Sequence, residues 1–274
     1  DSAEALCGSG GIDAVYICTR HDSHVGYIDL AARAGKAVFC EKPLALDLAA
    51  AEQAAGIVER SGIPFALGFN HRYSPGIRRL KLFLDGVGQR FDTLNVHFAT
   101  APFLQGWAGL AEQGGGILVC LGSHVFDLVR YLTPGEIRLA GSAARRRRLP
   151  DPYLDDTFAA LLTTPAGQVI SVHAHDHGNA RYATDPGHRI NTVQAFAGGE
   201  AAIAGTSSFD WYGADRSVSE RYPTDPLKAW GYEEINRRFL RLLRGMETDI
   251  PGIEAGLFAA SMVEACRLSI AREG

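Results

Sequence analysis

The sequence has few cysteines, no excess of basic residues and no long apolar run. Its five cysteines among 274 residues are odd in number and widely spaced, so they do not suggest the disulfide framework of a small secreted domain. The formal net charge of -4 gives no bulk attraction to nucleic acid or anionic membranes. No stretch predicts a membrane span, and the acidic start lacks the regions of a signal peptide. We therefore expect a cytoplasmic protein without nucleic-acid or membrane partners.

A second absence is the turn Gly-x-Gly-x-x-Gly between a strand and a helix. In dinucleotide-binding folds, these glycines let the backbone approach the pyrophosphate at a helix N-terminus. The most similar segment is Gly8-Ser9-Gly10-Gly11, but it precedes an apolar run instead of following one. We interpret it as a turn, with phosphate binding as the less favoured alternative.

The first 70 residues alternate between short apolar runs and amphipathic segments. The apolar runs predict strands at Asp13–Cys18, Ala37–Cys40 and Pro64–Phe69. Asp22 or Ser23 can cap a helix after the first strand, and Asp47 can cap one after the second. The order β-α-β-α-β predicts a parallel sheet with right-handed crossovers.

Polar clusters follow all three predicted strands. They are Thr19-Arg-His-Asp-Ser-His24, Glu41-Lys-Pro43 and Asn70-His-Arg-Tyr73. Any one of these residues could belong to a capped, solvated loop. Open parallel sheets, however, bind ligands at the carboxyl ends of their strands. Three clusters at this edge therefore favour a binding site.

The pattern changes to alternation from Phe91 onward. Leu94, Val96 and Phe98 alternate with polar residues, which predicts a half-buried strand. The turns 164–167 and 198–199 predict hairpins, and two amphipathic helices are predicted near 235–243 and 255–270. The expected fold class is α/β plus α+β. Residues 1–72 form the C-terminal half of a Rossmann-type parallel sheet, and residues 73–274 form a large, mostly antiparallel, open-faced sheet domain with terminal helices.

Two motifs, in this order, resemble a known family. They are Glu41-Lys42-Pro43 and the glycine-rich block 114–127, which is followed by Leu128-Val-Arg-Tyr-Leu132. Together they are similar to the Gfo/Idh/MocA family, named for glucose-fructose oxidoreductase, inositol 2-dehydrogenase and a rhizopine-catabolism protein. The resemblance covers nearly all of the chain. What the chain lacks is the segment that forms the family's first three strands. We therefore expect an N-terminally truncated member.

The resemblance implies an oxidoreductase that uses NAD or NADP on a secondary hydroxyl of a sugar, cyclitol or sugar derivative. It makes Lys42 the group that exchanges a proton with the substrate hydroxyl, and His124 the histidine that assists it. The cofactor-binding residues implied are Thr19, Arg20, His24, Glu41, Pro43 and Asn70. The substrate-binding residues implied are Arg72, Cys120, Asp127 and His173.

Cys120 departs from the family pattern, which has an aspartate there to orient the lysine. Cys120, His124 and Asp127 are expected to share one face of a single helix. A thiol does not supply the missing charge at neutral pH unless its pKa is depressed, so Asp127 is an alternative source. The alternative function is a non-catalytic ligand-binding or regulatory protein that keeps the fold.

His173, His175 and His177 alternate along one predicted strand. Same-face neighbours on a strand stand roughly 6–7 Å apart, which is long for a shared ion, so we predict no metal site. Substrate contact or a subunit interface is favoured instead. The family resemblance implies a homo-oligomer that buries the open face of the large sheet. The run Arg145-Arg-Arg-Arg148 predicts a solvated loop, with an anionic substrate as the alternative.

Overall fold

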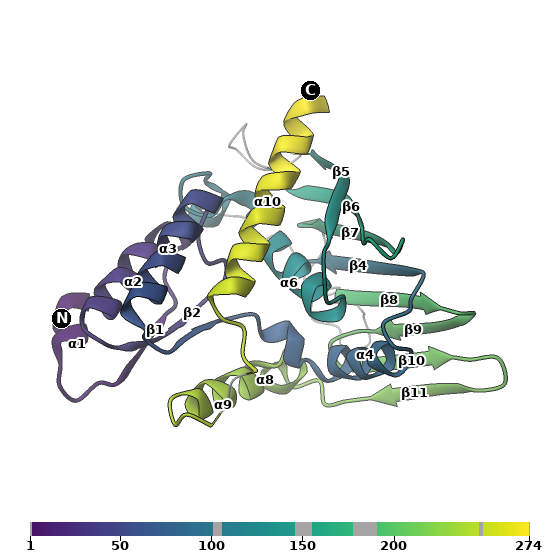
Figure 1. Cartoon of the computed structure of the whole chain (residues 1–274), viewed down its shortest axis with the longest axis horizontal. Coiled ribbons are helices and arrows are strands. Elements are labelled where there is room, and N and C mark those ends of the chain that lie inside the picture. The colour runs from purple at the N-terminus through teal and green to yellow at the C-terminus, as the bar shows by residue number, and fades with distance from the viewer. Residues whose placement is uncertain (1, 101–105, 146–154, 178–190, 247–248, 274) are drawn as a thin grey trace.

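The computed structural model describes residues 2–100, 106–145, 155–177, 191–246 and 249–273 (Figure 1). The chain forms a small parallel sheet and a large mixed sheet, with the long helix α10 between them (Figure 1). Within these ranges, no helix combines the length and apolar character that crossing a bilayer requires.

The small sheet has the predicted parallel arrangement. Strands β1 (Ala14–Ile17), β2 (Ala37–Cys40) and β3 (Phe65–Leu67) pair in that order. Helices α1 (Ala3–Gly8), α2 (His24–Arg33) and α3 (Leu48–Ser61) contribute to the core on one face. Helix α9 (Tyr232–Leu242) covers the other face, where the rings of Phe39 and Phe239 lie 5.4 Å apart. The sheet is therefore buried on both faces, as parallel sheets usually are.

The predicted helix caps have different outcomes. Asp47 accepts a hydrogen bond from the backbone N–H of Ala50 at 2.8 Å, which confirms the cap of α3. The predicted side-chain cap of α2 is wrong. Ser23 stands at the N-cap position, but its hydroxyl donates to the carbonyl of Arg20 at 2.8 Å. That serine closes the short 3-10 helix η1 (His21–Ser23), and the hydroxyl is unavailable to α2.

The large sheet has the order β11-β10-β9-β8-β4-β7-β6-β5. Its strands are β4 (Thr93–Ala99), β5 (Arg138–Arg145), β6 (Thr157–Thr163), β7 (Val169–His175), β8 (Asn191–Ala197), β9 (Glu200–Ala204), β10 (Ser208–Tyr212) and β11 (Ser217–Arg221). Among the described strands of this sheet, only β4 and β7 pair in parallel, so the prediction of a mostly antiparallel sheet is confirmed. The hairpins β6–β7 and β8–β9 form at the predicted turns.

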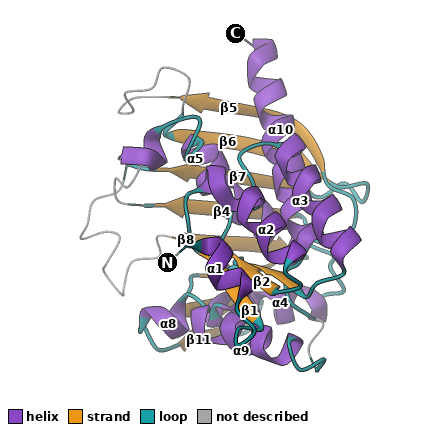
Figure 2. Ribbon diagram, turned by 90° about the vertical axis from the view of Figure 1, so that its left-hand side faces the viewer, coloured by secondary structure: helices purple, strands orange, loops and turns teal. Residues whose placement is uncertain are grey.

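Helices cover one face of the large sheet (Figure 2). They are α4 (Pro75–Gly86), α5 (Gly116–Cys120), α6 (Gly122–Leu132) and α10 (Ile253–Glu273), while the short elements η2 (Asn70–Tyr73), η3 (Gly106–Gly109) and α8 (Pro226–Ala229) lie in connections. The predicted alternation of β4 is confirmed, because Leu94, Val96 and Phe98 are buried in this core. The intervening residue His97 lies on the opposite, open face of the sheet.

Helix α10 joins the two cores. Ala255 and Ala259 pack in the core of the small sheet, whereas Met262 and Val263 pack in that of the large sheet. The predicted division places the small sheet in residues 1–72 and the C-terminal helices in residues 73–274. In the structure, those helices complete the cores on the two faces of the small sheet. At Gly256, an added Cβ would lie 2.7 Å from the side chain of Leu44. Only a glycine lets α10 pack this closely on the segment that follows Lys42.

Gly256→Ala should therefore lower the free energy of unfolding by about 1–3 kcal/mol, because the new methyl group overpacks this contact. Urea unfolding measures the change. Gly26→Ala, within α2, is the control, since no atom lies within 4 Å of its added Cβ. Equal stability of the Gly256 variant and the wild type would contradict the close approach.

Candidate active site

Lys42 lies where the small sheet meets the helices of the large one. Its Nζ donates to the carbonyl of Cys120 at 3.2 Å and lies 3.6 Å from Cys120 Sγ. The prediction of one continuous helix here is wrong, because the helix is interrupted at Leu121, between α5 and α6. The carbonyl of Cys120 stands at this interruption and accepts from Lys42 and from the hydroxyl of Ser123. The interruption thus supplies an acceptor for the ammonium group.

Four buried imidazoles lie close enough to the Lys42 ammonium group to feel its charge. Burial, followed by the positive charge of Lys42, lowers the pKa of His21 to about 4 and that of His71 to about 3. The same two causes lower the pKa of His124 well below its usual value. Burial also lowers the pKa of His24. These imidazoles are therefore neutral near pH 7, so each ring carries one N–H and one lone pair.

His24 supports the loops at the ends of β1 and β2. Its Nδ1 is 2.8 Å from the carbonyl oxygen of Pro43, and its Nε2 is 3.2 Å from that of Thr19. The residue has no exposed surface. His24 thus links the two loops from a fully buried position in the predicted cofactor region.

The other predicted cofactor residues lie along the same edge. Thr19 and Arg20 are exposed, and the guanidinium of Arg20 pairs with Asp22 at 3.1 Å. Glu41 packs closely against Gly68, the residue after β3, since an added Cβ there would lie 2.8 Å from its carboxylate. Burial raises the pKa of Glu41. Pro43 is buried, and the amide of Asn70 donates to the carbonyl of Trp230 at 2.7 Å.

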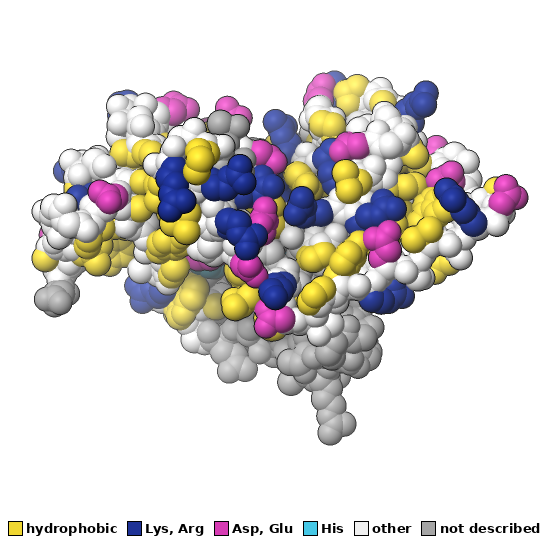
Figure 3. Space-filling view, turned by 90° about the horizontal axis from the view of Figure 1, so that it is seen from below, with side chains coloured by type: hydrophobic (Ala, Val, Ile, Leu, Met, Phe, Trp, Pro, Cys, Tyr) yellow, Lys and Arg dark blue, Asp and Glu magenta, His cyan; other side chains and the backbone are white. Residues whose placement is uncertain are grey.

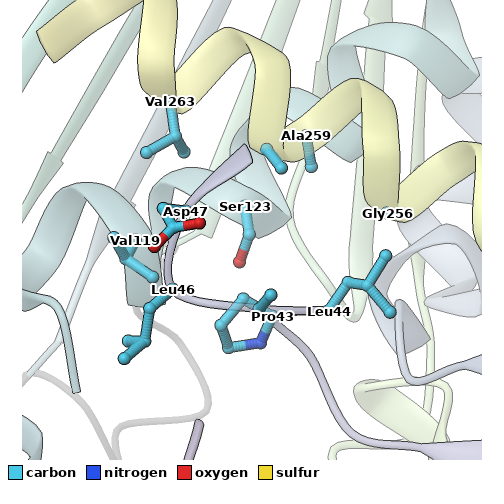
Figure 4. Close-up of a pocket in the computed structure, with 11 residues that line it drawn as sticks. Pro43, Leu44, Leu46, Asp47, Val119, Ser123, Gly256, Ala259 and Val263 are labelled. Carbon is cyan, nitrogen blue, oxygen red and sulfur yellow. The ribbon is translucent and has the colours of Figure 1, made fainter. Parts of the chain in front are cut away.

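A small hollow lies behind Pro43 (Figure 4). Its volume of about 10 Å³ is at the lower limit of the space that one water molecule needs. Figure 4 shows Ser123 from α6 and Gly256 and Ala259 from α10 around this hollow. The segment that follows Lys42 is consequently packed against two helices, which restrains the position of the lysine.

Arg72 and Asp127 form a buried ion pair. The guanidinium donates two hydrogen bonds to the carboxylate, at 2.8 and 2.5 Å, and the side chains are 14% and 2% exposed. Asp127 is thus engaged by Arg72, and does not replace the family's aspartate beside Lys42. No carboxylate in the described part of the chain forms an ion pair with Lys42.

His173 is not brought to this site. It lies on the open face of the large sheet, where its ring stacks on His97 at a centroid distance of 5.3 Å. On that face, His175 Nδ1 accepts from the backbone N–H of His177, and Nε2 lies 3.1 Å from His97 Nε2. Both nitrogens of His175 are therefore used within the protein. Over the residues with described positions, no group of three or more potential ligands could hold a metal.

Charges of both signs are interspersed on the surface seen from below (Figure 3). On α9, Arg237 pairs with Glu233 at 2.6 Å, and Arg238 pairs with Glu234 at 3.0 Å. On this helix, basic and acidic side chains thus neutralise one another. Residues 146–148 of the predicted basic loop lie outside the described residues.

His21 and His71 were within the polar clusters but were not assigned to the site. His21 Nδ1 lies 3.0 Å from the carbonyl of Gly114, which connects the end of β1 to the glycine-rich block. The ring of His71 contacts that of His124 at a centroid distance of 4.8 Å. The sequence signal for these two histidines was their position next to Arg20 and Asn70. Which residues of each polar cluster point into the site depends on contacts between segments that are distant in sequence.

A parallel sheet that gathers polar side chains at the carboxyl ends of its strands is typical of dinucleotide-binding folds. Comparison with family models is consistent with this class. Residues 1–69 match the model "Oxidoreductase family, NAD-binding Rossmann fold", and residues 91–206 match the "GFO/IDH/MocA C-terminal domain". The chain therefore belongs to the Gfo/Idh/MocA oxidoreductase family, as its motifs indicated.

Named relatives are similar over part of their length. The chain is 28% identical to an inositol 2-dehydrogenase of Rhizobium meliloti, over 66% of this chain and 54% of the relative. It is 33% identical to a D-apiose dehydrogenase of Paraburkholderia graminis, over 62% and 45% respectively. The chain thus spans about half the length of these curated relatives.

Solved structures show the same fold. A levoglucosan dehydrogenase in complex with NADH and levoglucosan superposes with a TM-score of 0.83 at 21% sequence identity. The match covers 98% of this chain and 81% of that one. At this identity the similarity establishes the arrangement of the elements.

Asp127→Leu should lower the free energy of unfolding by about 3–5 kcal/mol, because it leaves the guanidinium of Arg72 buried and unpaired. The double variant Arg72→Leu with Asp127→Leu is the matched control and should recover most of the loss. Chemical unfolding of all three variants measures the coupling. Additive losses would show that the ion pair is not a coupled unit.

His21 should make stability depend on pH. Its pKa is about 4 in the fold, below its unfolded value near 6.5, so the unfolded chain binds the proton first as the pH falls. The His21 contribution, up to about 3 kcal/mol, is present above pH 6.5 and is lost towards pH 4. His21→Gln should show a shallower dependence in urea unfolding at several pH values. Identical slopes would exclude this contribution.

Proposed function

We propose that the protein is an NAD- or NADP-dependent oxidoreductase that acts on a secondary hydroxyl of a sugar, cyclitol or sugar derivative. The observation that carries the proposal is the Lys42 ammonium group, held by the Cys120 carbonyl beside the neutral imidazole of His124. Relatives named as inositol and D-apiose dehydrogenases support this class of substrate.

The chemistry requires a proton to leave the hydroxyl oxygen as hydride leaves the carbon. Lys42 is the residue that exchanges this proton, and its ammonium form stabilises negative charge on the oxygen. The neutral imidazole of His124 can hydrogen-bond the same oxygen. A bound nicotinamide would supply the hydride chemistry.

The residues present fit the nicotinamide end of such a cofactor. The ends of all three strands meet beside Lys42, and the exposed Thr19 and Arg20 and the partly buried Glu41 lie along this edge. Pro43 and Asn70 would complete the pocket, with His24 supporting its loops. The connection from β1 to α2 contains η1 and no glycine-rich turn. The described residues thus offer no equivalent site for the pyrophosphate.

We further infer a cytoplasmic homo-oligomer in which the open face of the large sheet is buried, without a nucleic-acid or membrane partner. Leu161, Val169 and Phe196 on that sheet are 45%, 40% and 41% exposed. Apolar side chains on an open sheet face favour an interface between subunits. His173, His97 and His175 would lie within this interface.

A non-catalytic binding protein is the second candidate. It is favoured by the thiol of Cys120, the side-chain partner of Lys42 where the resembling family has a carboxylate. Binding of both cofactor and polyol without turnover would establish this second function.

Calorimetric titration with NADH and NADPH, followed by assays on cyclitols and sugars, tests the proposal. Lys42→Ala should lower kcat/KM by about 10²–10⁴-fold, because it removes the proton-exchanging group. Lys228→Ala, at an exposed position on α8, should leave kcat/KM unchanged. The absence of cofactor binding at millimolar concentration would rule out catalysis by this chain alone.

A further inference from the structure

We propose that His71 is a second hydrogen-bonding group of the substrate site, and that it selects polyols with a hydroxyl next to the reacting carbon. This inference rests on the proposed function, because it concerns the same site. It assigns a role to a buried residue that the chemistry of Lys42 and His124 does not use.

His71 lies at a junction of three segments. It belongs to η2, directly after β3, and its ring contacts Phe98 of β4 at a centroid distance of 5.1 Å. On another side, its ring lies 5.8 Å from that of Trp230 and 4.8 Å from that of His124. The imidazole is thus adjacent to His124 and packs against two aromatic side chains.

The residues on either side of His71 are all held by partly buried hydrogen bonds. Asn70 donates to the carbonyl of Trp230, Arg72 pairs with Asp127, and the hydroxyl of Tyr73 donates to the carbonyl of Asp249 at 3.0 Å. These contacts fix the turn in place. Such rigid support is typical of side chains that are preorganised for binding.

His71 itself has an unused polar atom. Its Nδ1 is fully buried and has no hydrogen-bond partner, and the residue is only 4% exposed. Unpartnered buried nitrogens are rare in native proteins because they lose their hydration without compensation. A group that arrives with the substrate would supply the missing partner.

A hydroxyl is the chemical group that suits this position. It can both donate and accept, so it matches a neutral imidazole in either tautomer. The nearby Lys42 charge disfavours a cationic ligand. Because His71 and His124 lie side by side, they can contact neighbouring hydroxyls of one small polyol.

The test compares myo-inositol with a monodeoxy-inositol that lacks the hydroxyl next to the reacting carbon. For the wild type, kcat/KM and the calorimetric affinity with NADH present should fall on the order of 10- to 100-fold upon this removal. His71→Phe keeps an aromatic ring and should treat both compounds alike. His71→Asn keeps a polar atom near Nδ1 and should retain part of the discrimination.

Thermal stability tests whether His71 Nδ1 lacks a partner in the ligand-free protein. His71→Phe should raise the Tm by roughly 2–4 °C, because it removes the unpartnered nitrogen from the ligand-free protein. Thr133→Val is the matched control, since the hydroxyl of Thr133 is also buried without a partner, just beyond α6. It should raise the Tm without changing the discrimination.

The failures of the two proposals are distinguishable. If the wild type neither binds nor converts any sugar or cyclitol, the proposed function fails and this inference fails with it. If the wild type converts myo-inositol but His71→Phe and His71→Asn discriminate as the wild type does, only the role of His71 is overturned. A lower Tm for His71→Phe with unchanged discrimination would also assign His71 to structure alone.

Discussion

The charge of one ammonium group near four buried imidazoles is the constraint on which the site depends. A second cation in this buried space would be strongly unfavourable, so the charge of Lys42 requires the surrounding histidines to be neutral. The acceptors that hold these groups are backbone carbonyls. Lys42 uses that of Cys120, His21 faces that of Gly114, and His24 faces that of Pro43. Loop and helix geometry, more than paired charges, therefore maintains the site.

Such a site retains its positive field. A carboxylate beside Lys42 would neutralise much of that field, whereas a carbonyl dipole does so only in part. The ammonium can then stabilise charge that develops on a substrate oxygen. The interruption at Leu121 makes this arrangement possible, because it places the carbonyl of Cys120 opposite Lys42. Packing of α10 at Gly256 restrains the other side of the same loop.

The features of the structure that the sequence predicted are those that depend on local residue patterns. The parallel strands, the cap at Asp47 and the hairpins follow from apolar periodicity and turn chemistry over a few residues. Lys42 was found through its motif. The pairing of Arg72 with Asp127 joins positions 55 residues apart, and no local pattern specifies it. The face of the sheet on which His173 lies became clear only from the packing of β7 against α6.

Cys120 shows how one substitution can separate binding from catalysis. A thiol 3.6 Å from Lys42 is a weak partner, so it holds the lysine less firmly than a carboxylate would. The backbone carbonyl of Cys120, 3.2 Å from Lys42 Nζ, helps to hold the lysine in position, because the carbonyl belongs to a helix end and not to a mobile side chain. The carbonyl does not replace a carboxylate in proton exchange, because a carbonyl accepts a hydrogen bond without taking up the proton. The neutral imidazole of His124 can hydrogen-bond a substrate oxygen beside Lys42 without becoming a second buried cation, and this pairing of groups is the feature that most favours an enzyme over a binding protein.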